Sequence, residues 1–545
     1  MKAFIQGLAI VIAYALSILQ PAIAADSRAA NLVTAEWLQK NLASGDLLVI
    51  DAAGTKAYAA KHIPGAIGVD MWRYGVPYKV PAAEMEKRIQ SWGVDSSRKV
   101  VVYDEGGGQM APWVFYELYY HGFPASDLFI LDGGLARWEA AGGAVTKEPT
   151  AAKPGNFRVT SVRDEARVRL DEFVSASGDT ARHAVVEALE PTYHYGGTQW
   201  FDRSGHVPNA LMMPTPDFYN ADKTFKSAEE IRRMAAYLGI RDEQQINSHC
   251  GGGIAATVPF FALKFVAGYP NVKVYRESQL EWLQDERGLP FWTYDAPYMK
   301  RDAQWVQSWG SPMLRMFGVS QLSVVDVRSP DAYLQGHVPF AVNVPAETFR
   351  AHLNDPRKLA EILGPAGVDP AHEAVIVSSG LTESAALAYV LLEKLGQKKV
   401  SVLIDSIDDW GLKGFPIVKE PTTVGAPKSP KDMAVRPAVY GAKPRSGIVV
   451  DDARATQGAY PKVFIASGKR VPAKAQDGKV VHVPYTDLVN ANGTPKPAVE
   501  IWNILVKAGV PRYAQIVVYS DEPGEAAVNY FIMKLMGYPD VKVIL

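Results

Sequence analysis

Cysteine is almost absent from this chain, because the 545 residues contain only one, Cys250. A single cysteine excludes an intramolecular disulfide and leaves a thiol that is either a buried structural residue or a reactive group. Net charge is also small: 57 Lys and Arg residues stand against 58 Asp and Glu residues, for a formal charge of -1. This balance gives no reason to expect nucleic acid or an anionic membrane surface as a partner. A clustered set of Cys and His ligands is missing too, so we expect no metal and no organic cofactor.

Long apolar runs are lacking after the N-terminus. Residues 1–24 combine Lys2, an apolar run over residues 3–19 and the sequence Ala22-Ile23-Ala24, a pattern typical of a secretory signal peptide. A retained membrane anchor is the alternative, but the run is shorter than the ~20 residues that a spanning helix needs. We therefore expect cleavage after Ala24, export to the periplasm and no membrane span in the mature chain.

One pattern recurs four times along the chain. Each copy has a strand, a turn, a second strand that runs into a loop and a helix, and a third strand. The first three copies carry a His-x-Pro turn and end in a helix with a tryptophan, at His62 and Trp138, His206 and Trp282, and His337 and Trp410. In the fourth, most divergent copy we assign the first strand to Val449-Val450-Asp451 and the second to residues 516–519. Strands that alternate with helices predict an α/β fold with mostly parallel sheets.

Polar stretches that contain Pro and Gly separate the copies and read as linkers. They lie at residues 149–156, 295–301 and 421–444. The predicted organisation is a signal peptide at 1–24 followed by four domains at 25–150, 151–300, 301–420 and 421–545. Each domain has about 120–150 residues, which is within the usual size range.

These motifs in combination resemble the rhodanese superfamily of sulfurtransferases. The resemblance rests on the Asp-x-Arg strand end at Asp326, the Gly-His-x-Pro turns and the Gly-Gly-x-x-x-Trp segment that ends at Trp138, and it covers essentially the whole mature chain. It implies four tandem rhodanese-like domains, each a central parallel sheet flanked by helices. The segment from Cys250 to Ala256 is most similar to the Gly-rich loop of mercaptopyruvate-type members. The residues that we align with the family's nucleophile are Asp104, Cys250, Ser379 and Ser520, so domains 1, 3 and 4 are expected to be inactive.

The residues around Cys250 favour a reactive thiol independently of the family. A cysteine at the end of a buried strand and directly before a helix lies among backbone N–H groups that stabilise an anion. Consecutive glycines let the backbone fold closely around the sulfur. We therefore expect Cys250 to be the catalytic nucleophile. The expected substrate-binding residues of the loop are Gly251, Gly252, Gly253, Ile254 and Ala255.

Two other Gly-rich loops fit the sequence less well. A phosphate-binding P-loop needs Gly-Lys-Ser/Thr at the helix start, whereas Gly253 precedes Ile254-Ala255. A cysteine phosphatase of related fold would, by family resemblance, carry an arginine six residues after the cysteine, where this chain has Ala256. Both readings are disfavoured.

The second domain departs from the family at the positions where arginines commonly hold an anionic donor. Leu189 and Tyr193 stand there, so either Arg203 and Arg276 supply the cation or the donor is not a small anion. His249 adjoins the thiol, but neighbouring strand residues face opposite sides, so we expect it to pack in the core. The turn histidines recur in copies without cysteine and are also expected to be structural. An aromatic insertion at residues 193–201 occurs only in this copy. We expect it either to line the pocket around the thiol or to contact another domain.

The predicted function is transfer of sulfane sulfur from a small donor, such as thiosulfate or 3-mercaptopyruvate, to cyanide or a thiol through a persulfide on Cys250. The alternative is a non-catalytic exported scaffold or sulfur-carrier protein that a partner protein loads. The missing arginines favour the carrier, and the intact loop favours the enzyme.

Overall fold

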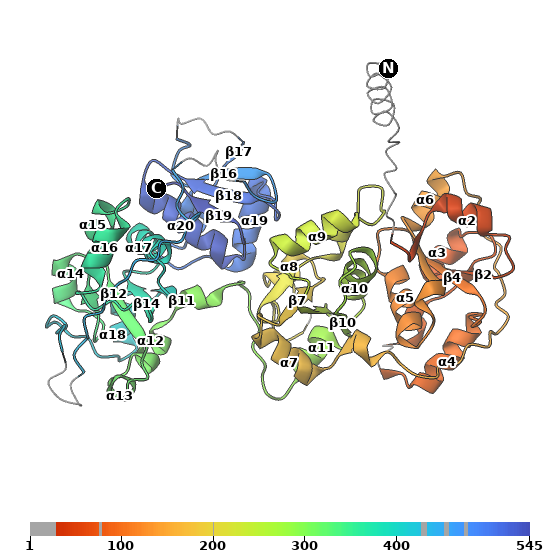
Figure 1. Cartoon of the computed structure of the whole chain (residues 1–545), viewed down its shortest axis with the longest axis horizontal. Helices are drawn as coiled ribbons and strands as arrows, with labels where there is room; N and C mark the ends of the chain where they lie inside the picture. Colours follow the sequence, from red (N-terminus) through yellow and green to blue (C-terminus); the bar gives the residue numbers. More distant parts are fainter. Residues whose placement is uncertain (1–28, 76–78, 200, 427–432, 452–456, 473–477) are drawn as a thin grey trace, which may run out of the picture. The chain divides into compact units, whose positions relative to one another are not determined.

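The structure is a computed structural model that describes residues 29–75, 79–199, 201–426, 433–451, 457–472 and 478–545 (Figure 1). The predicted signal peptide lies outside these residues. Among the residues described, no helix combines the length and the apolar character needed to cross a membrane.

The first sheet has the strand order β1-β5-β4-β2-β3. Its strands are β1 (Leu32–Val33), β2 (Leu47–Asp51), β3 (Ile67–Gly68), β4 (Lys99–Tyr103) and β5 (Leu128–Leu131). Its helices are α2 (Ala35–Asn41), α3 (Thr55–Ala60), α4 (Ala82–Ser91), α5 (Met110–Tyr120) and α6 (Gly134–Ala140).

The second sheet repeats this order as β6-β10-β9-β7-β8. Its strands are β6 (Arg167–Val168), β7 (His183–Glu187), β8 (Ala210–Met212), β9 (Gln245–His249) and β10 (Val272–Tyr275). Its helices are α7 (Leu170–Gly178), α8 (Pro191–His194), α9 (Ala228–Tyr237), α10 (Thr257–Phe261) and α11 (Ser278–Gln284).

The third sheet has the same order once more, β11-β15-β14-β12-β13. Its strands are β11 (Lys300–Arg301), β12 (Leu322–Asp326), β13 (Val342–Asn343), β14 (Glu373–Val377) and β15 (Lys399–Leu403). Its helices are α12 (Ala303–Trp309), α13 (Pro312–Met316), α14 (Pro330–Gln335), α15 (Ala346–Ala351), α16 (Pro356–Leu363), α17 (Glu383–Lys394) and α18 (Ile407–Leu412).

The fourth sheet has four strands among the residues described, in the order β17-β16-β18-β19. They are β16 (Lys462–Ala466), β17 (Lys479–His482), β18 (Gln515–Tyr519) and β19 (Val541–Val543), with helices α19 (Ala498–Ala508) and α20 (Pro523–Leu535). In the first, third and fourth sheets neighbouring strands pair in parallel, and in the second sheet β7 pairs in parallel with β8 and β9. The predicted α/β class with four parallel sheets flanked by helices is confirmed.

The repeated tryptophans anchor the helix that follows the last strand of each of the first three sheets. Trp138, Trp282 and Trp410 are each at most 2% exposed. Each indole N–H donates to a backbone carbonyl six or eight residues later, over 2.8 to 3.0 Å. The polar atom of each buried ring is thereby satisfied, which explains why the residue recurs.

The predicted first strand of the fourth domain was wrong. The strand that pairs with β18, as β2 pairs with β4, is β16 rather than Val449-Val450-Asp451. Val449 forms only an isolated bridge to Val543 at the other edge. The Val-Val-Asp sequence imitates the end of β12, whereas β16 runs into Ser467 without an acidic residue, so the pattern pointed to the wrong segment.

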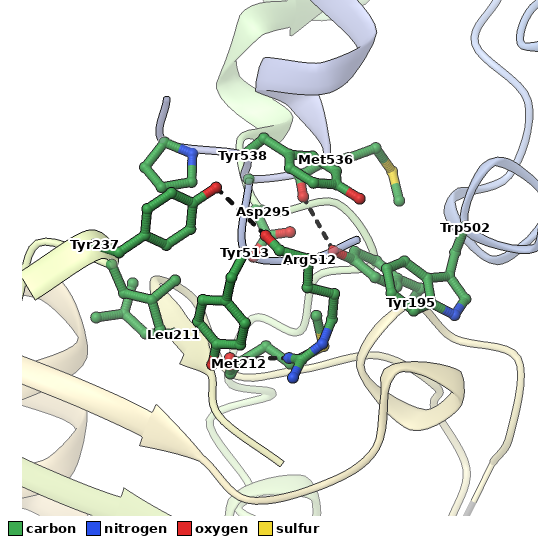
Figure 2. A pocket seen from close by; sticks show the side chains of 13 residues that line it. Tyr195, Leu211, Met212, Tyr237, Asp295, Trp502, Arg512, Tyr513, Met536 and Tyr538 are labelled. Atoms are coloured by element: carbon green, nitrogen blue, oxygen red, sulfur yellow. Dashed lines mark hydrogen bonds between the residues drawn. The ribbon is translucent and has the colours of Figure 1, made fainter. Parts of the chain in front are cut away.

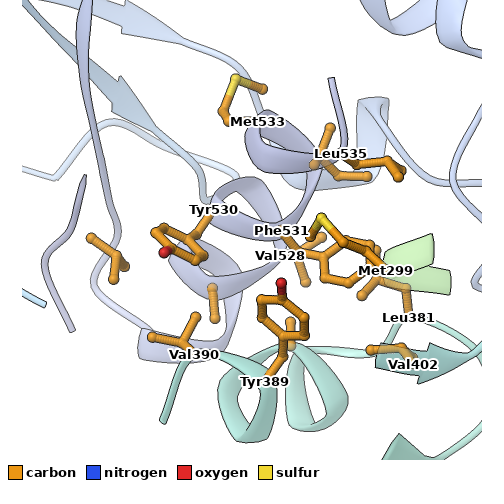
Figure 3. Packing of buried hydrophobic residues seen from close by; sticks show 14 of the residues in the cluster. Met299, Leu381, Tyr389, Val390, Val402, Val528, Tyr530, Phe531, Met533 and Leu535 are labelled. Atoms are coloured by element: carbon orange, nitrogen blue, oxygen red, sulfur yellow. The ribbon is translucent and has the colours of Figure 1, made fainter. Parts of the chain in front are cut away.

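Contacts divide the chain into two compact units, one of residues 1–167, 216–232 and 257–272 and one of residues 168–215, 233–256 and 273–545. Within the first unit α5 packs against α10, with Phe115 and Phe261 edge to face at 4.8 Å. Within the second unit α17 packs against α20, where Tyr389 meets Phe531 edge to face at 4.9 Å (Figure 3). The helices that follow the equivalent loops therefore join domain 1 to domain 2 and domain 3 to domain 4.

A second contact repeats in both pairs. In the first unit the Tyr219 hydroxyl donates to the carbonyl of Gly108, in the loop after β4, over 2.6 Å. In the second unit Leu381, in the loop after β14, donates its N–H to the carbonyl of Gly493 over 2.7 Å. A turn of the second domain thus covers the loop of the first domain in each pair, which indicates two copies of one two-domain arrangement.

Candidate active site

Cys250 directly follows β9 and is 3% exposed. The backbone N–H of Gly253 donates to its Sγ over 3.1 Å. The Cys250 N–H donates to the Ser278 hydroxyl over 3.0 Å, and that hydroxyl donates to the Tyr275 carbonyl over 2.7 Å. The sulfur therefore lies in a loop with an N–H directed at it, which stabilises a thiolate or persulfide anion.

The start of α11 holds this loop in place. Gln279 donates its N–H to the Cys250 carbonyl over 3.1 Å, and Leu280 donates to the Gly251 carbonyl over 2.9 Å. Ser278 is fully buried with φ +54°, the left-handed conformation that Gly134 adopts at the equivalent place in domain 1. A serine is uncommon in this conformation. Its side chain contributes the two hydrogen bonds described above, from the Cys250 N–H and to the Tyr275 carbonyl.

Two of the predicted loop glycines differ sharply in the space around them. Gly253 has φ +85°, and a Cβ there would lie 1.9 Å from the Arg276 carbonyl oxygen. A Cβ on Gly252 would meet nothing within 4 Å. The loop is thus closely packed at Gly253 and has free space at Gly252.

Strand register identifies the residues equivalent to Cys250. Glu187 of β7 pairs with His249, as Asp51 pairs with Tyr103 and Asp326 with Val377. The next residue is Cys250 in domain 2 and Ser378 in domain 3. The assignment of Ser379 to this position was therefore wrong by one residue, because two adjacent serines cannot be told apart without the register. Asp104 and Ser520 follow their strands directly, as predicted.

The loop of domain 1 holds a carboxylate where domain 2 has the thiol. Asp104 accepts backbone N–H groups from Gly106, Met110 and Ala111 over 2.8 to 3.2 Å. In domain 4 the Ser520 hydroxyl donates to the Glu525 carboxylate, and in domain 3 the hydroxyls of Ser378 and Thr382 lie 2.9 Å apart. The Asp104 contacts demonstrate that this loop binds an anion through its backbone.

The predicted cations have different surroundings. Arg203 donates to the Leu289 carbonyl over 2.7 Å, and this contact does not involve the Cys250 loop. Arg276 directly follows β10, is 5% exposed and has its carbonyl against Gly253. Leu189 is buried at one of the empty arginine positions. A donor-binding role for Arg276 or Arg203 stays a prediction.

The histidines next to the site pack in the core as expected. His249 is fully buried against the ring of Phe173, and burial lowers its pKa to about 4. In domains 1 and 3 the turn histidines His62 and His337 stack on Tyr58 and Tyr333 and contact the carbonyls of these tyrosines. These contacts give the turn histidines a structural role.

The insertion in domain 2 contacts domain 4 within the second unit. The Tyr195 hydroxyl donates to the Met536 carbonyl over 3.0 Å, and its ring stacks on Trp502 at 5.4 Å (Figure 2). Of the two alternatives left open, the interdomain contact is the one that these distances support.

A buried polar cluster next to the insertion was not predicted. His194 contacts the Glu187 carboxylate through Nδ1 and Asp295 Oδ1 through Nε2, the latter over 3.0 Å. Burial disfavours its charged form, but Asp295 and Glu187 raise the pKa of His194 to about 9. Gln279 joins the cluster to the Cys250 loop, because its side chain donates to Glu187 over 2.5 Å. His194 and Asp295 are 101 positions apart in sequence, so no local signal could reveal their contact.

Comparisons with known proteins agree with the fold. A family model described as the rhodanese-like domain matches residues 34–141 and 313–413. A protein from Pseudomonas aeruginosa named probable 3-mercaptopyruvate sulfurtransferase is 31% identical, and the match covers 47% of this chain and 96% of the relative. The sulfur carrier protein TtuD of Thermus thermophilus is 29% identical, with 46% of this chain and 93% of the relative covered.

Among solved structures, the chain is similar to SseA from Escherichia coli, described as a 3-mercaptopyruvate sulfotransferase with the rhodanese fold. The identity is 25% and the TM-score 0.42, over 46% of this chain and 98% of that one. The two family-model matches fall in the first and third predicted domains, and the Pseudomonas relative is matched over nearly its whole length. The chain therefore belongs to the rhodanese superfamily.

Proposed function

We propose that the protein is a sulfurtransferase that carries sulfane sulfur from a small donor to a thiol or cyanide as a persulfide on Cys250. The observation that carries this proposal is the position of the chain's only thiol, with the Gly253 N–H 3.1 Å from its sulfur. Relatives named mercaptopyruvate and thiosulfate sulfurtransferases support the reaction class. The Asp104 contacts in domain 1 support the anion-binding property of the loop.

The reaction takes place in two displacements. The Cys250 thiolate attacks the outer sulfur of thiosulfate, a bond forms to Sγ, and sulfite leaves with the electron pair of the broken S–S bond. With 3-mercaptopyruvate the carbon–sulfur bond breaks instead, and the departing pyruvate enolate takes up a proton. An acceptor thiolate or cyanide then attacks the outer persulfide sulfur, and the electron pair of that S–S bond returns to Cys250.

Thiocyanate formation from cyanide with thiosulfate or 3-mercaptopyruvate as the donor tests this proposal. We expect turnover by the mature protein and none above the protein-free rate for Cys250→Ser. Ser378→Ala and Ser520→Ala are matched controls, since they change the equivalent positions of domains 3 and 4, and both should retain the activity. Turnover that survives Cys250→Ser would overturn the proposal.

A sulfur-carrier role is the second candidate. The apolar Leu189 at an expected arginine position favours it, and one relative is named a sulfur carrier protein. A carrier would show no turnover with either small donor, yet would accept sulfur on Cys250 from a persulfide-bearing protein. The same assay, repeated with a persulfide-loaded protein as donor, separates the two roles.

We also propose export to the periplasm, which rests on the signal-peptide pattern of residues 1–24. N-terminal sequencing of the protein recovered from a periplasmic fraction should begin at Ala25. Recovery of the uncleaved chain from the cytoplasm would contradict this proposal.

A further inference from the structure

Two histidines and a carboxylate meet in the interior of the second unit. His194 lies at the end of α8, His206 in the turn before β8, and Asp295 after the second domain's last helix. One ligand atom from each residue lies within 4.8 Å of the other two. Both imidazoles are fully buried, and the Asp295 side chain is 20% exposed.

The outer nitrogens of both rings are already engaged. His194 Nδ1 contacts the Glu187 carboxylate, and His206 Nδ1 lies 2.8 Å from the His194 carbonyl. Acceptors at Nδ1 fix the tautomer in which Nε2 presents its lone pair, and histidines that bind metal commonly have such a partner. Among the residues described, His206 Nε2 has no hydrogen-bond partner although it is completely buried; His337 Nε2 in domain 3 shares this state but stacks on Tyr333, not on a second histidine. An unpartnered acceptor beside another histidine and a carboxylate points to a missing cation.

Packing alone does not explain these residues. In domains 1 and 3 the equivalent histidine stacks on a tyrosine, Tyr58 or Tyr333, whose hydroxyl donates to a backbone carbonyl over 2.9 or 2.8 Å. In domain 2 the residue equivalent to this tyrosine is His194. Its ring stacks on His206 with 3.7 Å between the ring centroids. The exchange of tyrosine for histidine adds a nitrogen ligand only in the copy that also supplies Asp295, whereas Glu187 has the counterparts Asp51 and Asp326 in domains 1 and 3.

We propose that His194, His206 and Asp295 bind one divalent transition-metal ion of the Zn²⁺ type. Two imidazole nitrogens and one carboxylate oxygen are a ligand set that such ions take, with Glu187 as the outer partner of His194. The ion takes the place of the proton between His194 Nε2 and Asp295 Oδ1, which lie 3.0 Å apart. A divalent ion also balances the charges of both carboxylates, whereas one imidazolium balances one.

Binding requires a local adjustment. The two rings are parallel to within 4°, so their nitrogen lone pairs do not converge, and one ring must tilt for both to reach the same ion. A fourth ligand has room to enter, because Asp295 also lines a cavity of about 50 Å³ together with Tyr195, Arg512 and Tyr538 (Figure 2). A water molecule from this cavity completes a four-coordinate site.

The site joins two domains within the second unit. Asp295 lies against domain 4, since a Cβ on Gly537 would come within 2.5 Å of the Asp295 carboxyl carbon. Tyr195, next to His194, donates to the Met536 carbonyl. The ion therefore has a structural role, the fastening of the insertion of domain 2 beside domain 4, and takes no part in sulfur transfer.

The test uses the mature chain with Cys250→Ser, which removes the thiol as a competing ligand. The protein is dialysed with Zn²⁺ or Co²⁺ and then against metal-free buffer, and retained metal is measured by elemental analysis. We expect about one ion per chain, together with visible Co²⁺ absorption that indicates nitrogen and oxygen ligands. His194→Tyr, which restores the residue of domains 1 and 3, and the isosteric Asp295→Asn should each lose the ion.

His337→Gln is the matched control, because it changes the equivalent histidine of domain 3, and it should retain the ion. Circular dichroism establishes whether each variant is folded. His194→Tyr and Asp295→Asn each remove a different ligand, so the test is complete if either of them is folded. If the Cys250→Ser protein retains no metal, the proposal is overturned, and a proton rather than a metal ion lies between His194 and Asp295. Equal retention by a folded site variant would overturn it as well.

Discussion

Gly252 and Gly253 are neighbours with opposite tolerance for a side chain. We predict that Gly253→Ala lowers kcat/KM for sulfur transfer by about 100-fold, because the Cβ would displace the N–H that contacts Sγ, and displacements near 1 Å have effects of this size. Gly252→Ala should stay within a few-fold of the parent, since a Cβ there meets nothing within 4 Å. Steady-state kinetics measures kcat/KM for both variants. A similar decrease in kcat/KM for both would contradict the geometry described for the loop.

Asp51 provides a pH-dependent contribution to stability. Burial, partly offset by a hydrogen bond from Tyr103, raises the pKa of Asp51 to about 6, against about 3.9 in an unfolded chain. The folded state therefore binds the proton more tightly, and the carboxyl destabilises the fold increasingly as the pH rises from about 4 to 6. We expect Asp51→Asn to gain stability relative to the parent by about 2–3 kcal/mol between pH 4 and pH 7.

Chemical denaturation of the parent and the Asp51→Asn variant at several pH values measures this difference. Asp408→Asn is a control at an exposed site. A difference in unfolding free energy that stays constant with pH for Asp51→Asn would show that the carboxyl has the same affinity for a proton in both states.

At the scale of elements, the loop between strand and helix directs backbone N–H groups at one acceptor, which is Asp104 in domain 1 and the Cys250 sulfur in domain 2. Asp104 accepts three backbone N–H groups in domain 1. Asp104→Asn should lower the unfolding free energy by about 1–3 kcal/mol, because the charged acceptor is lost and two donors at the start of α5 are left without it. Thermal unfolding followed by circular dichroism measures the change, and an unchanged transition would contradict the anion-site account.

The helix pair α17 and α20 joins domains 3 and 4 mainly through buried apolar side chains (Figure 3), and the Tyr530 hydroxyl adds a hydrogen bond to Glu393 over 3.0 Å. Phe531 is fully buried there against Tyr389. Phe531→Ala should cost about 3–5 kcal/mol of unfolding free energy, the usual cost of removing a buried phenylalanine side chain. Leu412→Ala, at a side chain that is 85% exposed, should change the stability little. Equal effects in urea denaturation would contradict the packing role of this helix pair.

The elements that could be predicted from sequence are those with a local signal. Buried apolar strands, the His-x-Pro turn and the helix with its tryptophan each occupy consecutive residues, and the structure confirms them in three domains. Ser378 could not be distinguished from Ser379, because only the pairing of Asp326 with Val377 fixes the count. The contacts of His194 could not be predicted either, because Asp295 is 101 residues away and is brought to it by folding alone.

At the scale of the whole molecule, the predicted domains show two similar pairings, α5 with α10 and α17 with α20. The Pseudomonas relative is matched over 96% of its length by 47% of this chain, as expected if one pair is equivalent to a whole relative. The second domain of the first pair carries Cys250, and the second domain of the second pair carries Ser520, bonded to Glu525. Under the proposed function, sulfur transfer therefore takes place in the pair that carries Cys250.

The mass of the intact mature protein tests the central claim most directly. After incubation with thiosulfate or 3-mercaptopyruvate and removal of the donor, the account predicts a gain of one sulfur atom per chain, located on the peptide that contains Cys250 and lost on addition of cyanide. Cys250→Ser should stay at its unmodified mass. A sulfur adduct on Cys250→Ser, or no adduct on the parent with either donor, would contradict the proposed persulfide.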